Sequence, residues 1–159
     1  MEANHRMRRT GLLSALLVCT AIALGALREF VFVNLNYQID FVLHARPGNY
    51  AHSAFRAWAD GMGATELIGA KWAFAAGFVA AILALTIALA RVRLANHGWL
   101  KAICITFFSL SALALLLHAL SGALPALYPV SIALLHGMQY PVPVLVVWML
   151  SWLRPTPHR

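Results

Sequence analysis

Acidic residues are scarce in this sequence, and charged residues of either sign are few. Only 5 of the 159 residues are Asp or Glu, charged residues make up 11% of the chain, and hydrophobic residues make up 62%. Ordinary soluble proteins have about 25% charged and about 45–50% apolar residues. A soluble domain of this length could not bury so much apolar surface, but lipid can solvate it. The composition therefore predicts a single integral membrane domain over residues 1–159.

The motifs of common enzyme classes are also missing. The sequence contains no G-x-S-x-G, no H-E-x-x-H and no glycine-rich phosphate loop, and its 2 cysteines do not form a C-x-x-C pair. Those patterns supply a nucleophile, zinc ligands, a phosphate cradle and a redox dithiol, respectively. Their absence argues against hydrolytic and thiol–disulfide chemistry and favours a protein that is not an enzyme.

Four apolar stretches are long enough to cross a bilayer. A helix rises about 1.5 Å per residue, so about 20 residues cross a hydrocarbon core of about 30 Å. Trp72 to Ala90 alone supplies 19 residues without a charge. We predict an all-α fold, a four-helix transmembrane bundle in which a periplasmic segment of about 31–63, helical at its start, follows the first helix. The predicted spans are about 10–30, 64–90, 101–124 and 128–153.

The fourth stretch contains two prolines, Pro141 and Pro143. Each proline lacks an amide donor and clashes with the carbonyl four residues earlier, so this span should be kinked or broken near its middle. A short connection, around 125–129, joins it to the third stretch. These two spans are therefore expected to be antiparallel neighbours.

Basic residues flank alternate ends of the stretches, at Arg6, Arg8, Arg9, Arg91, Arg93, Lys101, Arg154 and Arg159. Cytoplasmic loops carry an excess of Lys and Arg, so this pattern predicts cytoplasmic N- and C-termini in a bacterial inner membrane. No basic patch with interleaved aromatic residues occurs, so nucleic acid is not an expected partner. The expected partner is the lipid bilayer.

The first stretch could instead be a secretory signal peptide. It has basic residues before it and small residues at Ala23 and Gly25, as a cleavable leader does. However, the apolar character resumes at 30–33, and cleavage would leave three spans and upset the alternation of loop charge. We favour a retained span, and cleavage stays an alternative.

The segment 28–44 fits two periodicities. Its polar residues alternate at Asn34, Asn36, Gln38 and Asp40, as in a strand, whereas Phe32, Leu35, Ile39 and Val42 fall on one face of a helix. A lone strand beside a helical bundle would have an unpaired edge. We therefore favour a helix that extends the first span, with an amphipathic collar on the membrane surface as the alternative.

Polar residues near the spans collect in the predicted outer half of the bundle. Ionisable residues are costly in a membrane, so such a cluster indicates a functional site by default. We predict a ligand or ion site formed by Arg28, Glu29, Glu66, Lys71, His118, His136 and Tyr140.

Within this cluster, Lys71 and Glu66 point about 140° apart on one helix and are poor partners. Glu29 is the expected partner of Lys71. Glu66 should face a neighbouring helix. The alternatives are that Lys71 reaches the head groups and that Glu66 caps the start of its helix.

Small residues recur every four positions at Gly69, Ala73 and Gly77. Such a row lets another helix approach closely, so it predicts helix packing. The partner could be a helix of this chain, a second copy in a homo-oligomer, or a larger membrane complex.

Two histidines are the candidates for a cofactor. His118 lies seven residues before Pro125 and His136 seven after Pro129, so both should lie at similar depth on neighbouring helices. We expect His118 to face His136 and Tyr140. Imidazoles placed in this way could hold haem or a metal, and hydrogen bonding between helices is the alternative.

Three classes of function remain open at this point. The first is a non-catalytic membrane subunit or assembly factor, which suits the small size, the row of small residues and the missing motifs. The second is a small oligomeric channel or transporter lined by the polar outer half. The third is a haem- or metal-binding membrane redox protein or enzyme that uses His118 and His136.

Overall fold

The structure, a computed structural model, describes residues 2–45, 48–94 and 98–152. Helices are the regular secondary structure of this part of the chain, which contains no strand, and this confirms the all-α prediction. The helices are α1 (Glu2–His44), α2 (Ser53–Trp58), α3 (Ala64–Arg93), α4 (Gly98–Leu120), α5 (Leu127–Gln139) and α6 (Val142–Trp152).

Three of these helices, α1 from Arg8 onward, α3 and α4, are long and apolar enough to cross a membrane. The pair α5 and α6 makes a fourth if it counts as one span, although it bends by 59° at its break. The chain is thus an all-helical protein with three to four candidate membrane spans. The break falls at Tyr140 and Pro141, as the two prolines predict. Residue 153, the predicted end of the fourth span, lies outside the described residues.

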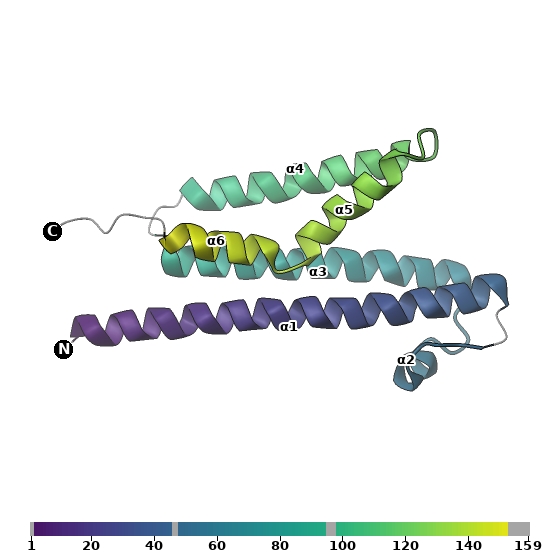
Figure 1. The fold of residues 1–159 in the computed structure, drawn as a ribbon, viewed down its shortest axis with the longest axis horizontal. Helices are drawn as coiled ribbons and strands as arrows, with labels where there is room; N and C mark the ends of the chain where they lie inside the picture. The colour runs from purple at the N-terminus through teal and green to yellow at the C-terminus, as the bar shows by residue number, and fades with distance from the viewer. Residues whose placement is uncertain (1, 46–47, 95–97, 153–159) are drawn as a thin grey trace.

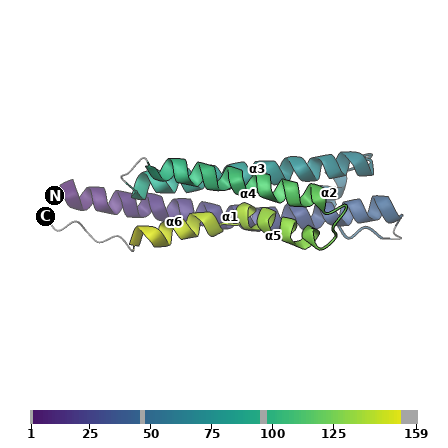
Figure 2. The ribbon, with the colours of Figure 1, turned by 90° about the horizontal axis from the view of Figure 1, so that it is seen from above.

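Figures 1 and 2 show how the helices pack. α1 lies antiparallel to α3 over most of its length, and α5 runs obliquely from the end of α4 towards α3, where α6 continues beside α3. The start of α1, the end of α3 and the start of α4 lie at one end of the bundle (Figure 1). The basic residues near these three ends, among them Arg9, Arg93 and Lys101, therefore lie at a common end.

The main apolar core lies between the break in α5–α6 and this basic end. Ile82 and Leu89 of α3, Ala114 of α4 and Val144 of α6 are fully buried there. α3 is the central helix because it contacts α1, α4, α5 and α6.

Residues 31–44 continue α1 as a helix, as favoured over a strand. Leu35 is fully buried against Ala59 and Leu67, which fixes this extension to α3 and to the loop before it. The alternating amides hold the same loop. Asn34 Oδ1 accepts from the backbone N–H of His52 at 2.6 Å, and Gln38 Oε1 accepts from Asn49 Nδ2 at 2.6 Å.

The row Gly69, Ala73 and Gly77 is exposed on α3. A Cβ atom added to Gly69 or Gly77 would meet nothing within 4 Å. The expected close contact with another helix of this chain is therefore not made among the described residues. The larger residues on the other face of α3, such as Phe78 and Ile82, are the ones buried in the bundle.

Candidate functional site

Arg28 lies on the inner face of α1. Other buried residues of this helix precede and follow it at intervals of three to four positions. Ala21 and Leu35 on this face are fully buried, and Arg28 is only 3% exposed. A buried guanidinium in an apolar environment needs hydrogen bonds and a counter-charge. The fold must therefore supply both at this point.

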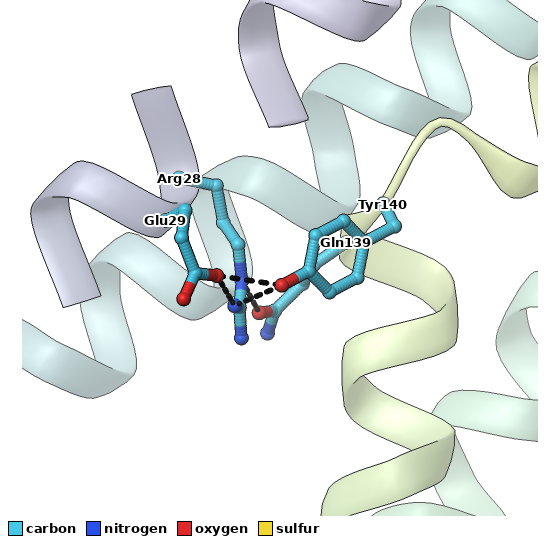
Figure 3. Close-up of polar contacts among 4 residues, drawn as sticks. All are labelled: Arg28, Glu29, Gln139 and Tyr140. Carbon is cyan, nitrogen blue, oxygen red and sulfur yellow. Dashed lines mark hydrogen bonds and ion pairs between the residues drawn. The ribbon is translucent and has the colours of Figure 1, made fainter. Parts of the chain in front are cut away.

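Figure 3 shows the contacts that do so. Arg28 Nε donates to Gln139 Oε1 at 3.0 Å, and Arg28 Nη1 donates to Glu29 Oε2 and to the Tyr140 hydroxyl, both at 3.0 Å. The Tyr140 hydroxyl donates in turn to Glu29 Oε2 at 2.6 Å. Arg28 Cζ also lies 4.6 Å from the Phe32 ring centre and 4.8 Å from the Tyr140 ring centre, within cation–π range.

The break between α5 and α6 places Gln139 and Tyr140 against Arg28. Pro141 has no amide donor, so α5 ends before it and Tyr140 takes an extended conformation. α1 approaches this break closely at Gly25, where an added Cβ atom would lie 3.0 Å from Pro141 Cδ. The glycine thus lets α1 come near enough for Arg28 to reach both side chains.

A cavity of about 530 Å³ opens beside this cluster, between α1, α3, α4 and α5. We call it the polar cavity. Its polar and charged lining residues are Arg28, Glu29, Asn36, Lys71, His118, His136 and Gln139. Lys71 Nζ donates to Asn36 Oδ1 at 2.8 Å.

The structure thus brings together most of the residues that the sequence marked, with two differences in detail. Glu66 is not part of the cluster, because it is exposed and accepts from the backbone N–H of Gly63 at 2.9 Å, as a helix cap. Lys71 bonds Asn36 and not Glu29, which is already engaged by Arg28 and Tyr140. Tyr140 supports Arg28 from beside the cavity.

The two histidines line the same cavity but have different neighbours. The His118 ring lies 5.1 Å from the Trp72 ring and 5.9 Å from the Tyr128 ring, between their centroids. The His136 ring lies 6.4 Å from that of Tyr140. Among the described residues, no group of three or more His, Cys, Asp or Glu side chains is placed to hold a metal ion.

Sequence reasoning left two of these polar residues out of the site. Gln139 is 2% exposed, and its Oε1 atom accepts from Arg28 Nε. Its signal in the sequence is its position just before the double proline, which makes it the last residue of α5. Asn36 lies in the extension of the first span, as the sequence predicts. The sequence does not indicate that its side chain accepts a hydrogen bond from Lys71 of α3.

Two residues that line the cavity each have a fully buried nitrogen atom without a hydrogen-bond partner among the described residues, namely Arg28 Nη2 and His118 Nδ1. A buried donor without a partner costs about 1–3 kcal/mol, and more when it carries charge. The charged lining residues are two cations, Arg28 and Lys71, and one anion, Glu29. The residues around the polar cavity therefore include a charged donor without a partner and, with neutral histidines, carry one excess positive charge.

A second cavity, of about 470 Å³, lies on the other side of α5, towards the basic end of the bundle. Apolar residues such as Phe107, Met138 and Val147 dominate its lining. The polar groups of the first cavity thus do not continue into this one.

No family model matches the chain, and no curated protein or solved structure is similar to it.

Proposed function

We propose that this chain is a non-catalytic four-span subunit of a bacterial inner membrane, with both termini cytoplasmic, that binds an anionic group in the polar cavity. One observation carries the proposal. Arg28 is 3% exposed, yet its Nη2 atom has no partner among the described residues and its charge is shared with a single carboxylate. An anion in the adjoining cavity would balance the charge that Glu29 leaves uncompensated, and it would offer acceptors to a guanidinium that lacks one.

Lys71 supports the same conclusion. An ammonium group has three donor hydrogens, and the bond to Asn36 uses one of them. The remaining donors belong to a side chain that lines the cavity. Arg28 and Lys71 together can attract an anion, whereas Glu29 is occupied by Arg28 and Tyr140.

The proposal is tested by the melting temperature of the purified protein in an uncharged detergent, at constant ionic strength. Two families of probes are compared: soluble anions (phosphate and acetate) and an anionic lipid (phosphatidylglycerol). At least one of the two families of probes should raise the melting temperature of the wild type and of Lys101→Gln. The same probes should raise the melting temperature of Lys71→Gln by a smaller amount. Lys101 is a matched control because it is exposed on α4, at the basic end of the bundle. If neither family stabilises the wild type, the proposal fails.

The other two classes of function gain less support. A channel needs a polar path across the membrane, and the second cavity is apolar. A haem- or metal-binding role for His118 and His136 predicts visible absorption or bound metal in the purified protein, and either finding would replace the present proposal.

A further inference from the structure

We infer that the anionic group taken up by the polar cavity is the head group of a membrane lipid with one net negative charge, which enters sideways from the bilayer. This inference rests on the proposed function and names the ligand class for the same site. Four features of the cavity support it: its charge, its depth, its rim and its size.

The charge of the cavity calls for a monoanion. Its charged lining residues are Arg28, Glu29 and Lys71, which sum to one positive charge when the histidines are neutral. Burying an unbalanced charge is costly in an apolar environment, and a second negative charge would again be unbalanced. A phosphodiester whose other substituents are neutral carries one negative charge and two oxygen atoms that accept hydrogen bonds.

The cavity lies at the depth of lipid head groups. The apolar stretch of α1 runs from Gly11 to Leu27 and ends at Arg28, and that of α3 runs from Trp72 to Ala90 and begins after Lys71. These 17 and 19 residues measure about 26 and 29 Å at about 1.5 Å per residue, close to the thickness of the hydrocarbon core. Because α1 and α3 are antiparallel neighbours, both cations lie at the same border of the apolar layer (Figure 1).

The rim of the cavity is apolar and aromatic. Val33, Ile68, Trp72 and Tyr128 line the cavity and are 38%, 41%, 40% and 52% exposed, respectively. A ligand already in the bilayer would contact these exposed apolar side chains favourably. Trp and Tyr are also the residues enriched at the head-group level of membranes.

The size of the cavity fits a head group and not a whole lipid. Its volume of about 530 Å³ lies in the range that accommodates a drug-sized molecule. The two acyl chains of a phospholipid would remain outside, against the exposed apolar rim. The protein would then recognise charge inside the cavity and leave the chains in the bilayer.

Three probes separate charge from lipid character. Phosphatidylglycerol has a phosphodiester and one net negative charge, and phosphatidylcholine has the phosphodiester without net charge. Glycerophosphoglycerol has the phosphodiester and charge of the first without its chains. Binding is measured in an uncharged detergent by native mass spectrometry and by the melting temperature. We expect stabilisation by phosphatidylglycerol, and little by the other two at equal concentration.

The variants locate the site. Lys71→Gln should weaken apparent binding of phosphatidylglycerol about tenfold or more, as expected for the loss of a charge-assisted hydrogen bond. Its amide can still donate to Asn36, which favours retention of the fold. Lys71→Arg, which keeps the charge, and Lys101→Gln, at the other end of the bundle, should bind as the wild type does.

Each contrary result has its own meaning. Equal stabilisation by glycerophosphoglycerol would overturn the lipid inference and leave the proposed function standing. Equal binding of phosphatidylcholine would overturn the charge argument. An equal loss of binding in Lys101→Gln would show general surface attraction and overturn the assignment to this cavity. Stabilisation by none of these probes, nor by phosphate or acetate, would end the lipid inference and the proposed function together.

Discussion

Arg28 Nε donates a hydrogen bond of 3.0 Å to Gln139 Oε1, joining residues 111 positions apart in the chain. Both side chains are almost fully buried. The bond ties the middle of α1 to the last residue of α5, at the break between α5 and α6. The break between α5 and α6 thus places an acceptor beside the buried guanidinium of Arg28, and the bond to Arg28 in turn holds the end of α5 against α1.

Gln139→Leu should lower the stability of the protein by about 1–3 kcal/mol, because it leaves a buried charged donor without an acceptor. Gln139→Glu keeps an acceptor at the same place and adds an opposite charge, so it should be better tolerated. Thermal unfolding in detergent measures both. If the two variants melt at the same temperature, the Arg28–Gln139 bond does not contribute as described.

Tyr140→Phe should cost less than Gln139→Leu. It removes the hydroxyl that bridges Arg28 and Glu29 but keeps the ring beside the guanidinium. Glu29 has a 55% exposed side chain and can turn to water. We expect a loss of about 0.5–1.5 kcal/mol, the usual net value of one hydrogen bond. Tyr50→Phe, at an 81% exposed position, is the control and should leave the melting temperature unchanged.

The fold was largely predictable because lipid imposes simple rules on a chain. Long uncharged stretches predicted the candidate spans, and the missing amide donors of Pro141 and Pro143 predicted the break. The helical extension of α1 could be chosen over a strand because an isolated strand leaves its edge unpaired. Each of these conclusions depends on local sequence and on the cost of an unsatisfied backbone group.

The partners within the site were less predictable because they depend on how far each helix rotates about its axis. Lys71 lies within reach of two residues of α1, and only packing decides that it bonds Asn36 and not Glu29. The same holds for the row of small residues that includes Gly77. Its spacing shows that another helix could approach closely, but it does not show which helix does so. Burial of Gln139 depends on the exact direction in which α5 ends.

Gly77→Leu tests whether anything covers the row of small residues. In the single chain an added side chain at Gly77 meets nothing within 4 Å, so the melting temperature should change little. Leu83→Ala should lower it, because Leu83 packs against the main apolar core. This order reverses the one that the spacing alone suggests. If Gly77→Leu destabilises as strongly as Leu83→Ala, another chain must cover this face, and the mass of the protein in detergent should fall in that variant.

The proposed topology of four spans predicts an alternating pattern in reporter fusions. Fusions after Arg9, Pro47, His97, Ala126 and Arg159 should report cytoplasm, periplasm, cytoplasm, periplasm and cytoplasm. The pattern follows from the basic residues gathered at one end of the bundle and from α5–α6 acting as one bent span. A cytoplasmic reporter after Pro47, or a mature N-terminus near Ala26, would contradict it.

The last prediction concerns His118 and His136, which line one cavity without sharing a ring partner. His118 packs on Trp72 and Tyr128, so His118→Ala removes an aromatic contact between α3, α4 and α5. His136→Ala removes a contact with Tyr140 at the break. Effects on stability usually add within about 0.3–0.5 kcal/mol when two residues do not touch. The free energy of unfolding of the double variant should therefore fall by the sum of the decreases measured in the two single variants.

A shared ligand would change that sum. If haem, a metal ion or a direct hydrogen bond joined the two imidazoles, the second substitution would cost much less than the first, because the joint interaction would already be lost. Melting temperatures of the wild type, both single variants and the double variant complete the cycle, and a visible spectrum of each sample identifies haem. With additive losses and a flat visible spectrum, each histidine acts as a separate part of the cavity wall, and the ligand contact belongs to Arg28 and Lys71.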